Sequence, residues 1–320
     1  QYLTPQGFRD FQTRDTIIQI KNAQPITITL RWTENGPVFP SQFEPLRNIT
    51  PVGHVVALRM TALSPNDTTL GAALAMMRAK NSAEVLRSAE GYIAPSWNLT
   101  LTDPTGIALK TIGALPRRQA EHQSQGRIPS PGWIAKNRWT GRLPYGDNPE
   151  FINPASGLLG NTNNKLIDRP FPRHMSFDWG DSQRIKRWQK LMTAREVHSR
   201  DSFIEAQLDT VSFTARSLLP LIGAELWFSS ETAPSGTAER QRKKALDLLA
   251  GWNGEMNEHL PEPLLYSAWI KALQNRLIQD ELGPLAAAFQ HVEPLFIERV
   301  FRNLDGAAIW CDVKQSSRIE

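Results

Sequence analysis

Residues 153–164 read Asn-Pro-Ala-Ser-Gly-Leu-Leu-Gly-Asn-Thr-Asn-Asn, inside a region from 114 to 178 that is dense in Pro, Gly, Asn and Trp. This region keeps neither a helical nor a strand period. Irregular segments longer than about 15 residues are uncommon in compact domains and are usually functional or disordered. Apolar side chains such as Trp133, Trp139 and Phe151 argue against disorder. The sequence therefore predicts an ordered, wrapping loop that builds a site.

The part of the chain before this loop reads mainly as strands. Residues 16–20 and 26–33 alternate and are rich in β-branched side chains, with Asn22 in the turn between them, which predicts a β-hairpin. Further strand patterns lie at 55–60, 97–102 and 107–112. Short helical patterns lie at 70–79 and 83–89. Met76 and Met77, in the first of these, are expected to fill a core.

After Asp181 the pattern becomes helical. Apolar residues repeat at spacings of four and three, which places them on one stripe of a helix: Ile204, Leu208, Val211, Ala215, Leu218 and Ile222. Pro220 and Gly223 stop the stripe too early for a coiled coil, so core packing in a globular helix is the better interpretation. Further helical patterns lie at 238–249, 263–280 and 294–304.

Composition and local motifs exclude several kinds of function. The net charge of +4 is spread over scattered Lys and Arg residues, and no run approaches the ~18 apolar residues of a membrane span, so we expect neither a nucleic acid nor a membrane partner. The single cysteine, Cys311, excludes a Cys-based metal cluster, and the six histidines show no pairing at metal-binding spacing. A phosphate loop, a His-Glu-x-x-His pair and a Gly-x-Ser-x-Gly elbow are absent from the sequence.

A series of short motifs flanks the opening stretch in a fixed order. They are Asp103-x-x-Gly106, Gly113-x-x-Pro116-x-Arg118, the segments 127–132 and 139–144, Asn148-Pro149, the segment 179–185, Gln207-x-Asp209 and Trp310-Cys311-Asp312. Together with 153–164 this series resembles the penicillin amidase family, which includes penicillin, cephalosporin and acyl-homoserine-lactone acylases. The resemblance covers nearly the whole chain, and the ordered series is far more specific than any one motif.

The resemblance implies the fold. It implies an α+β protein with part of the αββα sandwich of N-terminal nucleophile hydrolases and a helical lobe. Residues 1–180 are then expected to form the β-rich part of that core, with the loop at 114–178 building the site. Residues 181–320 are expected to form the mainly helical lobe of the same catalytic subunit. A periplasmic or secreted location is also implied.

The resemblance also implies the chemistry. In this family a Ser at the start of a chain attacks an amide carbonyl, and its own α-amine serves as the base, because a free amine titrates near neutral pH. The expected substrate is a small penicillin-, cephalosporin- or acyl-homoserine-lactone-like amide. The chain begins with Gln1, which cannot serve, and both ends look cut. We therefore expect the nucleophile on sequence missing from this chain, the remainder of the same precursor as its partner, and no activity from this piece alone.

Two functional residues carry over by position. Asn163, in the paired-Asn segment, matches the family's oxyanion-hole Asn, whose neutral NH2 donates to developing negative charge without changing protonation. Arg184 matches the Arg that follows a Trp-Gly turn and helps to orient the catalytic centre. Asn164 is expected to be a structural turn residue.

Calcium is a separate expectation. Many members of the family hold a structural calcium ion, with one acid following the paired Asn. At that position this chain has Arg173 and His174, with Asp168 and Asp178 nearby but out of register. We therefore expect no cofactor in this chain, while structural calcium remains open for the full protein.

A hypothesis of a different class is a non-catalytic carbohydrate- or protein-binding module. It is motivated by the β-rich start, the ten Trp residues and the long ordered loop. This hypothesis predicts tryptophans gathered on an exposed face.

Overall fold

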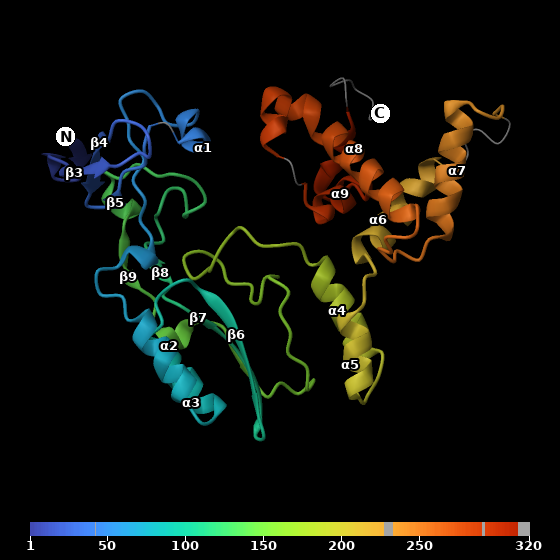
Figure 1. The fold of residues 1–320 in the computed structure, drawn as a ribbon, viewed down its shortest axis with the longest axis horizontal. Helices are drawn as coiled ribbons and strands as arrows, with labels where there is room; N and C mark the ends of the chain where they lie inside the picture. Colours follow the sequence, from blue (N-terminus) through green and yellow to red (C-terminus); the bar gives the residue numbers. More distant parts are fainter. Residues whose placement is uncertain (42, 227–232, 290–291, 313–320) are drawn as a thin grey trace. The chain divides into compact units, whose positions relative to one another are not determined.

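The computed structural model describes residues 1–41, 43–226, 233–289 and 292–312 (Figure 1). The chain separates into two compact units. The first holds Gln1–Leu159 and Leu166–Asp178, and the second holds Gly160–Lys165 and Trp179–Glu320. The short piece at 160–165 thus belongs to the second unit, although the residues on both sides of it belong to the first.

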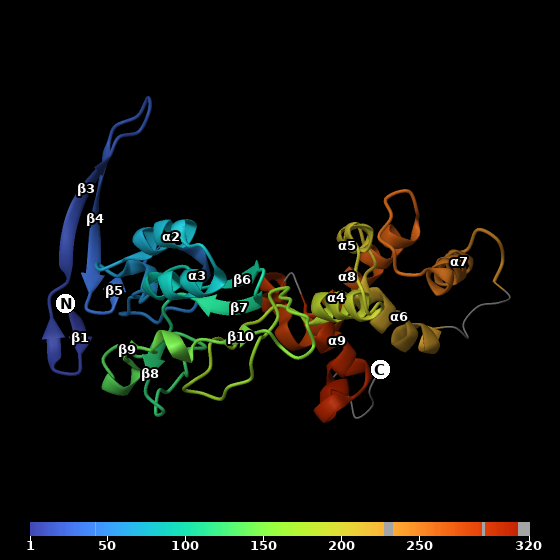
Figure 2. The same cartoon turned by 90° about the horizontal axis from the view of Figure 1, so that it is seen from below.

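The first unit opens with antiparallel hairpins. Its first strands are β1 (Tyr2–Thr4), β2 (Gly7–Arg9), β3 (Gln12–Ile18), β4 (Ile26–Thr33) and β5 (Gly36–Pro37). β1 pairs with β2, and β3 pairs with β4 over seven residue pairs that end with Ile18 opposite Ile26. The predicted hairpin is therefore confirmed, and Figure 2 shows it as an extended two-stranded ribbon. Two short helical segments follow, α1 (Glu44–Arg47) and η1 (Thr61–Leu63).

The strand predicted at 55–60 is wrong. Only Ala57 of this segment makes a β-bridge, with Val38. Two backbone hydrogen bonds join this segment to residues 37–39: Phe39 N donates to Val56 O, and Leu58 N donates to Pro37 O, both at 2.9 Å. Pro37 and Pro40 carry no amide hydrogen, so the facing segment cannot extend the ladder.

A three-stranded sheet with two helices follows. The elements are α2 (Thr69–Arg78), α3 (Ser82–Ser88), η2 (Ala89–Gly91), β6 (Trp97–Asp103), β7 (Gly106–Ile112) and β10 (Glu150–Ile152). The helices and the β6–β7 hairpin were predicted and are confirmed. β7 is the central strand, and its last five residues are buried. One of them is Lys110, whose Nζ lies 2.9 Å from a carboxylate oxygen of Glu150 and 4.4 Å from the centre of the Tyr145 ring.

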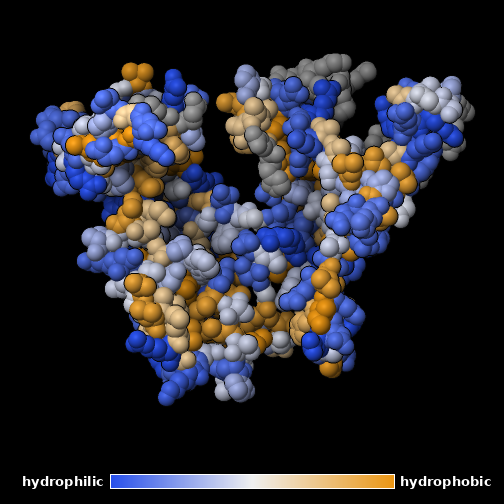
Figure 3. All heavy atoms as spheres, viewed as in Figure 1, coloured by the Kyte–Doolittle hydropathy of each residue, from blue (hydrophilic) through white to orange (hydrophobic). Residues whose placement is uncertain are grey.

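Helix α2 presents an apolar row to the outside. Leu70, Leu74 and Met77 lie at i, i+4 and i+7, and Met77 is 82% exposed, so its expected role in a core is wrong. The buried residue of α2 is the small Ala72, which packs close to Gly91. In Figure 3, orange atoms mark apolar side chains over this part of the first unit.

The region 114–178 is ordered by side chains that bind the backbone. It contains β8 (Pro116–Arg118), η3 (Ala135–Asn137), β9 (Trp139–Arg142) and η4 (Tyr145–Asp147). Buried Asn148 donates from Nδ2 to Thr111 O at 3.0 Å, and Asn153 Oδ1 accepts from Ile107 N at 2.8 Å. Gly106 has φ of 152°, and a Cβ there would lie 1.9 Å from Asn153 Oδ1, so only glycine fits. The motifs Asp103-x-x-Gly106 and Asn148-Pro149 thus hold the loop against strand β7.

The second unit is helical. Its helices are α4 (Gln183–Thr193), α5 (Arg200–Gln207), α6 (Phe213–Leu226), α7 (Ala238–Gly251), α8 (Glu262–Leu282), η5 (Gly283–Ala288), α9 (Pro294–Phe301) and η6 (Leu304–Cys311). The helical patterns predicted after 238 are confirmed. The largest core cluster joins α6, α8 and α9 through buried side chains that include Leu218, Leu277 and Ile297.

The single stripe predicted from Ile204 to Ile222 is two helices, α5 and α6. Residues between them bond elsewhere: Val211 bridges Glu255, and Ser212 N donates to Gly254 O at 2.7 Å. These bonds compete with the helical ones and break the helix. Within the stripe Ala215 and Leu218 are fully buried, as core packing predicted, whereas Leu208 is 73% exposed; the side chain of Ile222 lies outside the described residues.

The mixture of a strand-rich first unit and a helical second unit confirms the α+β class. Within the described ranges, no helix is long and apolar enough to cross a membrane.

Candidate active site

The Asn163 loop, residues 160–165, is a tight turn shaped by its own asparagines. Asn161 Oδ1 accepts from Asn163 N at 3.1 Å, and Asn164 Oδ1 accepts from Thr162 N at 3.1 Å. Asn163 is exposed and has φ of 68°, a left-handed conformation that Asn tolerates better than most residues. The neighbouring asparagines therefore act on the backbone, and the side chain of Asn163 projects from the turn.

Arg184 lies in the first turn of α4 and reaches this loop. Asp181 Oδ1 accepts from Gln183 N at 2.9 Å, which satisfies one of the unpaired amides at the start of the helix. From that turn Arg184 Nη2 donates to Thr162 O at 2.5 Å and to Asn163 Oδ1 at 2.9 Å. The structure thus brings together the two residues that the sequence singles out.

The contact with Arg184 fixes which way the Asn163 amide faces. Because Oδ1 of Asn163 accepts from a guanidinium, its Nδ2 group is turned away from Arg184. No hydrogen bond from this Nδ2 is found among the described residues. A cation on the amide oxygen also draws electron density from the NH2 group, which strengthens it as a donor. The arrangement presents a neutral, oriented N–H donor, which is what a developing oxyanion requires.

Sequence reasoning missed two residues that fix the surroundings of α4: Arg187 ties the helix to the segment after α5, and Trp188 contacts the loop. Arg187 binds Asp209 of the Gln207-x-Asp209 motif, with Nε 2.8 Å from Oδ1 and a second bond from Nη2 to Oδ2. This pair raises the pKa of Arg187 and lowers that of Asp209. Trp188 packs against Gly160. Since 184, 187 and 188 are at i, i+3 and i+4, their common face was available from helical spacing.

A second cluster lies in the first unit, where the family's calcium acid would fall. The rings of His122, Phe171, His174 and Phe177 follow one another at centroid distances of 6.3, 5.0 and 4.3 Å, and we call them the histidine stack. Arg127 lies over the Phe177 ring at 3.9 Å. Burial and then Arg118 lower the pKa values of His122 and His174.

Positively charged groups beside His174 do not suit a calcium ion, which takes oxygen ligands. Among the residues that the structure describes, no group of three or more His, Cys, Asp or Glu side chains is placed to hold a metal ion. The residues at this position therefore do not fit a calcium ion. The expectation that this chain holds no cofactor stays a prediction.

The histidine stack predicts a pH-dependent stability. In the unfolded chain a histidine titrates at about pH 6.5, and in the fold the pKa values of His122 and His174 are lower, so the unfolded chain binds more protons below that pH. The stabilisation is present above the unfolded pKa and lost as the pH falls toward the folded pKa. We expect the free energy of unfolding in urea to fall between about pH 7 and pH 5.

Replacing His122 and His174 by Phe should flatten this dependence. His259, whose side chain is 84% exposed, provides the control as His259→Gln, which should leave the dependence intact. An equal pH slope in the wild type and the double Phe variant would contradict the interpretation.

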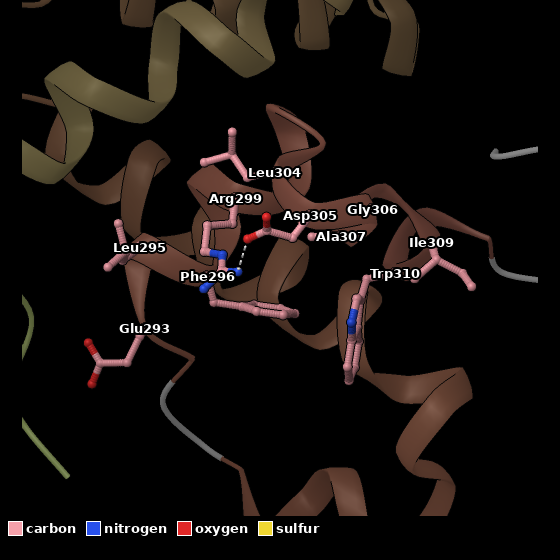
Figure 4. A pocket seen from close by; sticks show the side chains of 10 residues that line it. All are labelled: Glu293, Leu295, Phe296, Arg299, Leu304, Asp305, Gly306, Ala307, Ile309 and Trp310. Carbon is pink, nitrogen blue, oxygen red and sulfur yellow. Dashed lines mark hydrogen bonds and ion pairs between the residues drawn. The ribbon is translucent and has the colours of Figure 1, made fainter. Parts of the chain in front are cut away.

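A pocket of about 420 Å³ lies between α9 and η6 in the second unit (Figure 4). Phe296 and Trp310 meet edge to face at 5.1 Å in its apolar wall, and Arg299 and Asp305 pair at 2.7 Å. The two charges satisfy each other, and the lining carries neither Asn163 nor Arg184. The contact between Asn163 and Arg184 is thus the candidate active site, and the pocket is not part of it.

Comparison with solved structures identifies the class of fold. The chain matches the thermostable penicillin G acylase from Alcaligenes faecalis with a TM-score of 0.71 and 20% identity, over 91% of this chain and 51% of that chain. The fold is therefore that of an N-terminal nucleophile hydrolase, as predicted. The penicillin amidase family profile matches residues 1–320, and the chain belongs to this family.

Curated relatives carry two kinds of name. The acyl-homoserine lactone acylase QuiP of Pseudomonas aeruginosa is 25% identical over 292 residues, which are 88% of this chain and 34% of that protein. The penicillin G acylase of Escherichia coli is 26% identical over 285 residues, 83% of this chain and 31% of that protein. The penicillin acylase 2 proenzyme of Pseudomonas sp. SE83 is 25% identical, over 81% of this chain and 31% of that protein. The chain spans about a third of the length of these relatives.

Proposed function

We propose that this chain is part of an acylase that hydrolyses the amide bond of a small acyl amide of the penicillin, cephalosporin or acyl-homoserine-lactone type. The observation that carries the proposal is the bond from Arg184 Nη2 to Asn163 Oδ1, which turns the Asn163 NH2 group away from Arg184. In the proposed reaction this NH2 group donates to the oxyanion. Membership of the penicillin amidase family and relatives named acylases support the reaction class.

In the proposed reaction a Ser at the start of a processed chain attacks the amide carbonyl, and its α-amine takes the hydroxyl proton. The carbonyl oxygen becomes negative, and Asn163 Nδ2 donates to it. Collapse of the intermediate expels the amine, which receives the proton, and leaves an acyl-enzyme ester. Water then adds to the ester with the same donor in place and gives a proton to the α-amine. Collapse breaks the bond between the acyl carbon and the Ser oxygen, the proton passes to that oxygen, and the carboxylic acid is released.

The nucleophile is proposed to lie on polypeptide outside residues 1–320. This chain corresponds to about a third of relatives such as the Pseudomonas aeruginosa acylase, which leaves ample sequence for the remaining part. The partners are then the remainder of the same precursor, including the other processed chain, and the amide substrate. The family resemblance also supports a periplasmic or secreted location for the whole protein.

The binding-module hypothesis receives no support from the tryptophans. Of the nine that the structure describes, with Trp227 lying outside it, only Trp97 and Trp133 are in the exposed range, at 60% and 36%. They come from a strand and from the loop at 114–178, and Trp133 tilts against His54 at 5.7 Å. Among the described tryptophans the other seven are at least partly buried, so they do not supply the exposed tryptophan face that this hypothesis predicts.

An activity assay tests the proposal. The full-length precursor, after processing, should release free amine from at least one of penicillin G, a cephalosporin and an N-acyl homoserine lactone. The 320-residue chain alone should release none, because it lacks the attacking Ser. Turnover by the 320-residue chain would show that the nucleophile lies within it. A processed full-length enzyme that is inert toward all three amides would contradict the acylase function.

A further inference from the structure

The Asn163 loop and α4 meet at a second point, one turn along the helix from Arg184. Gly160, the first residue of the loop, packs against the indole of Trp188. A Cβ at Gly160 would lie 2.6 to 2.7 Å from three atoms of that ring. Such distances are far below van der Waals contact, so any side chain at position 160 must push the loop or the ring aside.

Arg184 and Trp188 are four residues apart in α4 and therefore share one face of the helix. This face contacts the loop at both ends of its turn: Trp188 at Gly160, and Arg184 at Thr162 and Asn163. The position of Asn163 relative to α4 thus depends on two contacts of different chemistry, one polar and one steric.

Gly180, just before α4, limits how far the Asn163 loop can move. A Cβ at this residue would lie 3.3 Å from Asn163 O, so the backbone of Asn163 passes close to the Trp179-Gly180 segment that leads into α4. The loop therefore has little room to retreat from Trp188 without disturbing Asn163. A displacement at Gly160 is expected to reach the amide three residues later.

We propose that Trp188 and Gly160 are positioning residues for the oxyanion donor: the indole sets the distance of the Asn163 loop from α4, and glycine is required where the ring contacts the loop. The inference rests on the proposed function, because it gives Trp188 a role only through Asn163. Neither residue is expected to touch the substrate.

The size of the effect follows from geometry. A displacement of about 1 Å at a reacting centre can lower the rate by about 10²-fold. A donor that serves the oxyanion acts mainly in the transition state, so its misplacement lowers kcat and kcat/KM together and leaves KM nearly unchanged. We expect Gly160→Ala to lower kcat by roughly ten- to a hundredfold.

The experiment uses the full-length processed enzyme and a chromogenic N-acyl-4-nitroanilide, with active sites counted by burst titration. Gly160→Ala, Trp188→Phe and Trp188→Ala are each measured alone and in an Asn163→Ala background. Titration separates the rate per active site from the amount of folded enzyme, which a merely structural defect would reduce. Gly251→Ala is the matched control, since a Cβ there meets no atom within 4 Å and the residue ends α7 in the same unit.

The expected result is strong coupling. Gly160→Ala and Trp188→Ala should each lower kcat in the wild type but change it by less than about twofold once Asn163 is absent. Trp188→Phe, which keeps a ring against Gly160, should retain more activity than Trp188→Ala. If Gly160→Ala alone does not fold, the double variant Gly160→Ala/Trp188→Ala has room for the methyl group, and its kcat should match that of Trp188→Ala.

Two results would overturn the inference while leaving the proposed function intact. One is a kcat for Gly160→Ala and Trp188→Ala equal to that of Gly251→Ala. The other is the same fold-loss with and without Asn163, which would place the effect elsewhere. If Asn163→Ala itself has wild-type kcat, the oxyanion assignment fails and the inference fails with it.

Discussion

Asn163→Ala in the full-length processed enzyme is expected to lower kcat by about 10²- to 10³-fold, with KM nearly unchanged, because removal of one oxyanion donor costs about 3 kcal/mol of transition-state stabilisation. The substitution removes Nδ2, the donor that Arg184 turns outward. Single-turnover acylation of an N-acyl-4-nitroanilide measures the step in which the oxyanion first forms.

The matched control is Asn66→Ala, at an exposed turn residue of the first unit. It should retain kcat within about twofold, since surface substitutions have small effects. An acylation rate for Asn163→Ala within a few-fold of wild type would show that this amide does not serve the oxyanion. Asn163→Asp tests the donor chemistry further, because a carboxylate of similar size accepts hydrogen bonds and repels the developing charge.

Arg184→Met in the same enzyme is expected to lower kcat by roughly ten- to a hundredfold, somewhat less than Asn163→Ala. The long side chain remains, but the bonds from Nη2 to Thr162 O and Asn163 Oδ1 are lost, so the amide can rotate and the turn loosens. Arg184→Lys should fall between Met and Arg, because an ammonium carries the charge without the planar geometry of the guanidinium.

Arg173→Met provides the control for loss of an exposed positive charge and should leave kcat close to wild type. In the Asn163→Ala background Arg184→Met should lower kcat by only about twofold, because Arg184 then has no amide side chain to orient. A loss of equal size in both backgrounds would show that Arg184 acts on the reaction without Asn163.

Elements governed by a single segment were predictable. The β3–β4 hairpin, the β6–β7 hairpin and helices such as α2 and α8 follow from alternation, helical period and turn residues. The β6–β7 hairpin and both helices match their predicted ranges closely, whereas β3 begins four residues earlier and ends two residues earlier than predicted. These patterns need no knowledge of distant partners.

Elements that depend on distant partners were not predictable. The break between α5 and α6 arises because Val211 and Ser212 bond to residues 254–255, more than forty positions away. Likewise, Lys110 is buried because Glu150 and Tyr145 receive its charge. A pattern read along one segment assigns such residues by their own polarity alone.

The residues of the candidate site could be predicted from the sequence, but the contacts between them could not. Motif order singled out Asn163 and Arg184, but their contact closes a loop of about twenty residues with no regular period, and no spacing rule predicts it. In the sequence Trp188 is one of ten tryptophans, and helical spacing places it on the face of Arg184 without showing what it contacts. Its contact with Gly160 becomes visible only when the loop is placed on α4. The catalytic roles themselves stay predictions.

The assignment of residues 160–165 to the helical unit has a topological consequence. The chain leaves the first unit after Leu159, returns to it at Leu166 and leaves it again after Asp178. Neither unit is therefore encoded by one uninterrupted stretch, and cutting the chain at a single point cannot isolate either of them whole. A protease nick between 166 and 178 would cut the covalent link between the donor loop and the helix that orients it, so only their mutual contacts would keep the donor in place.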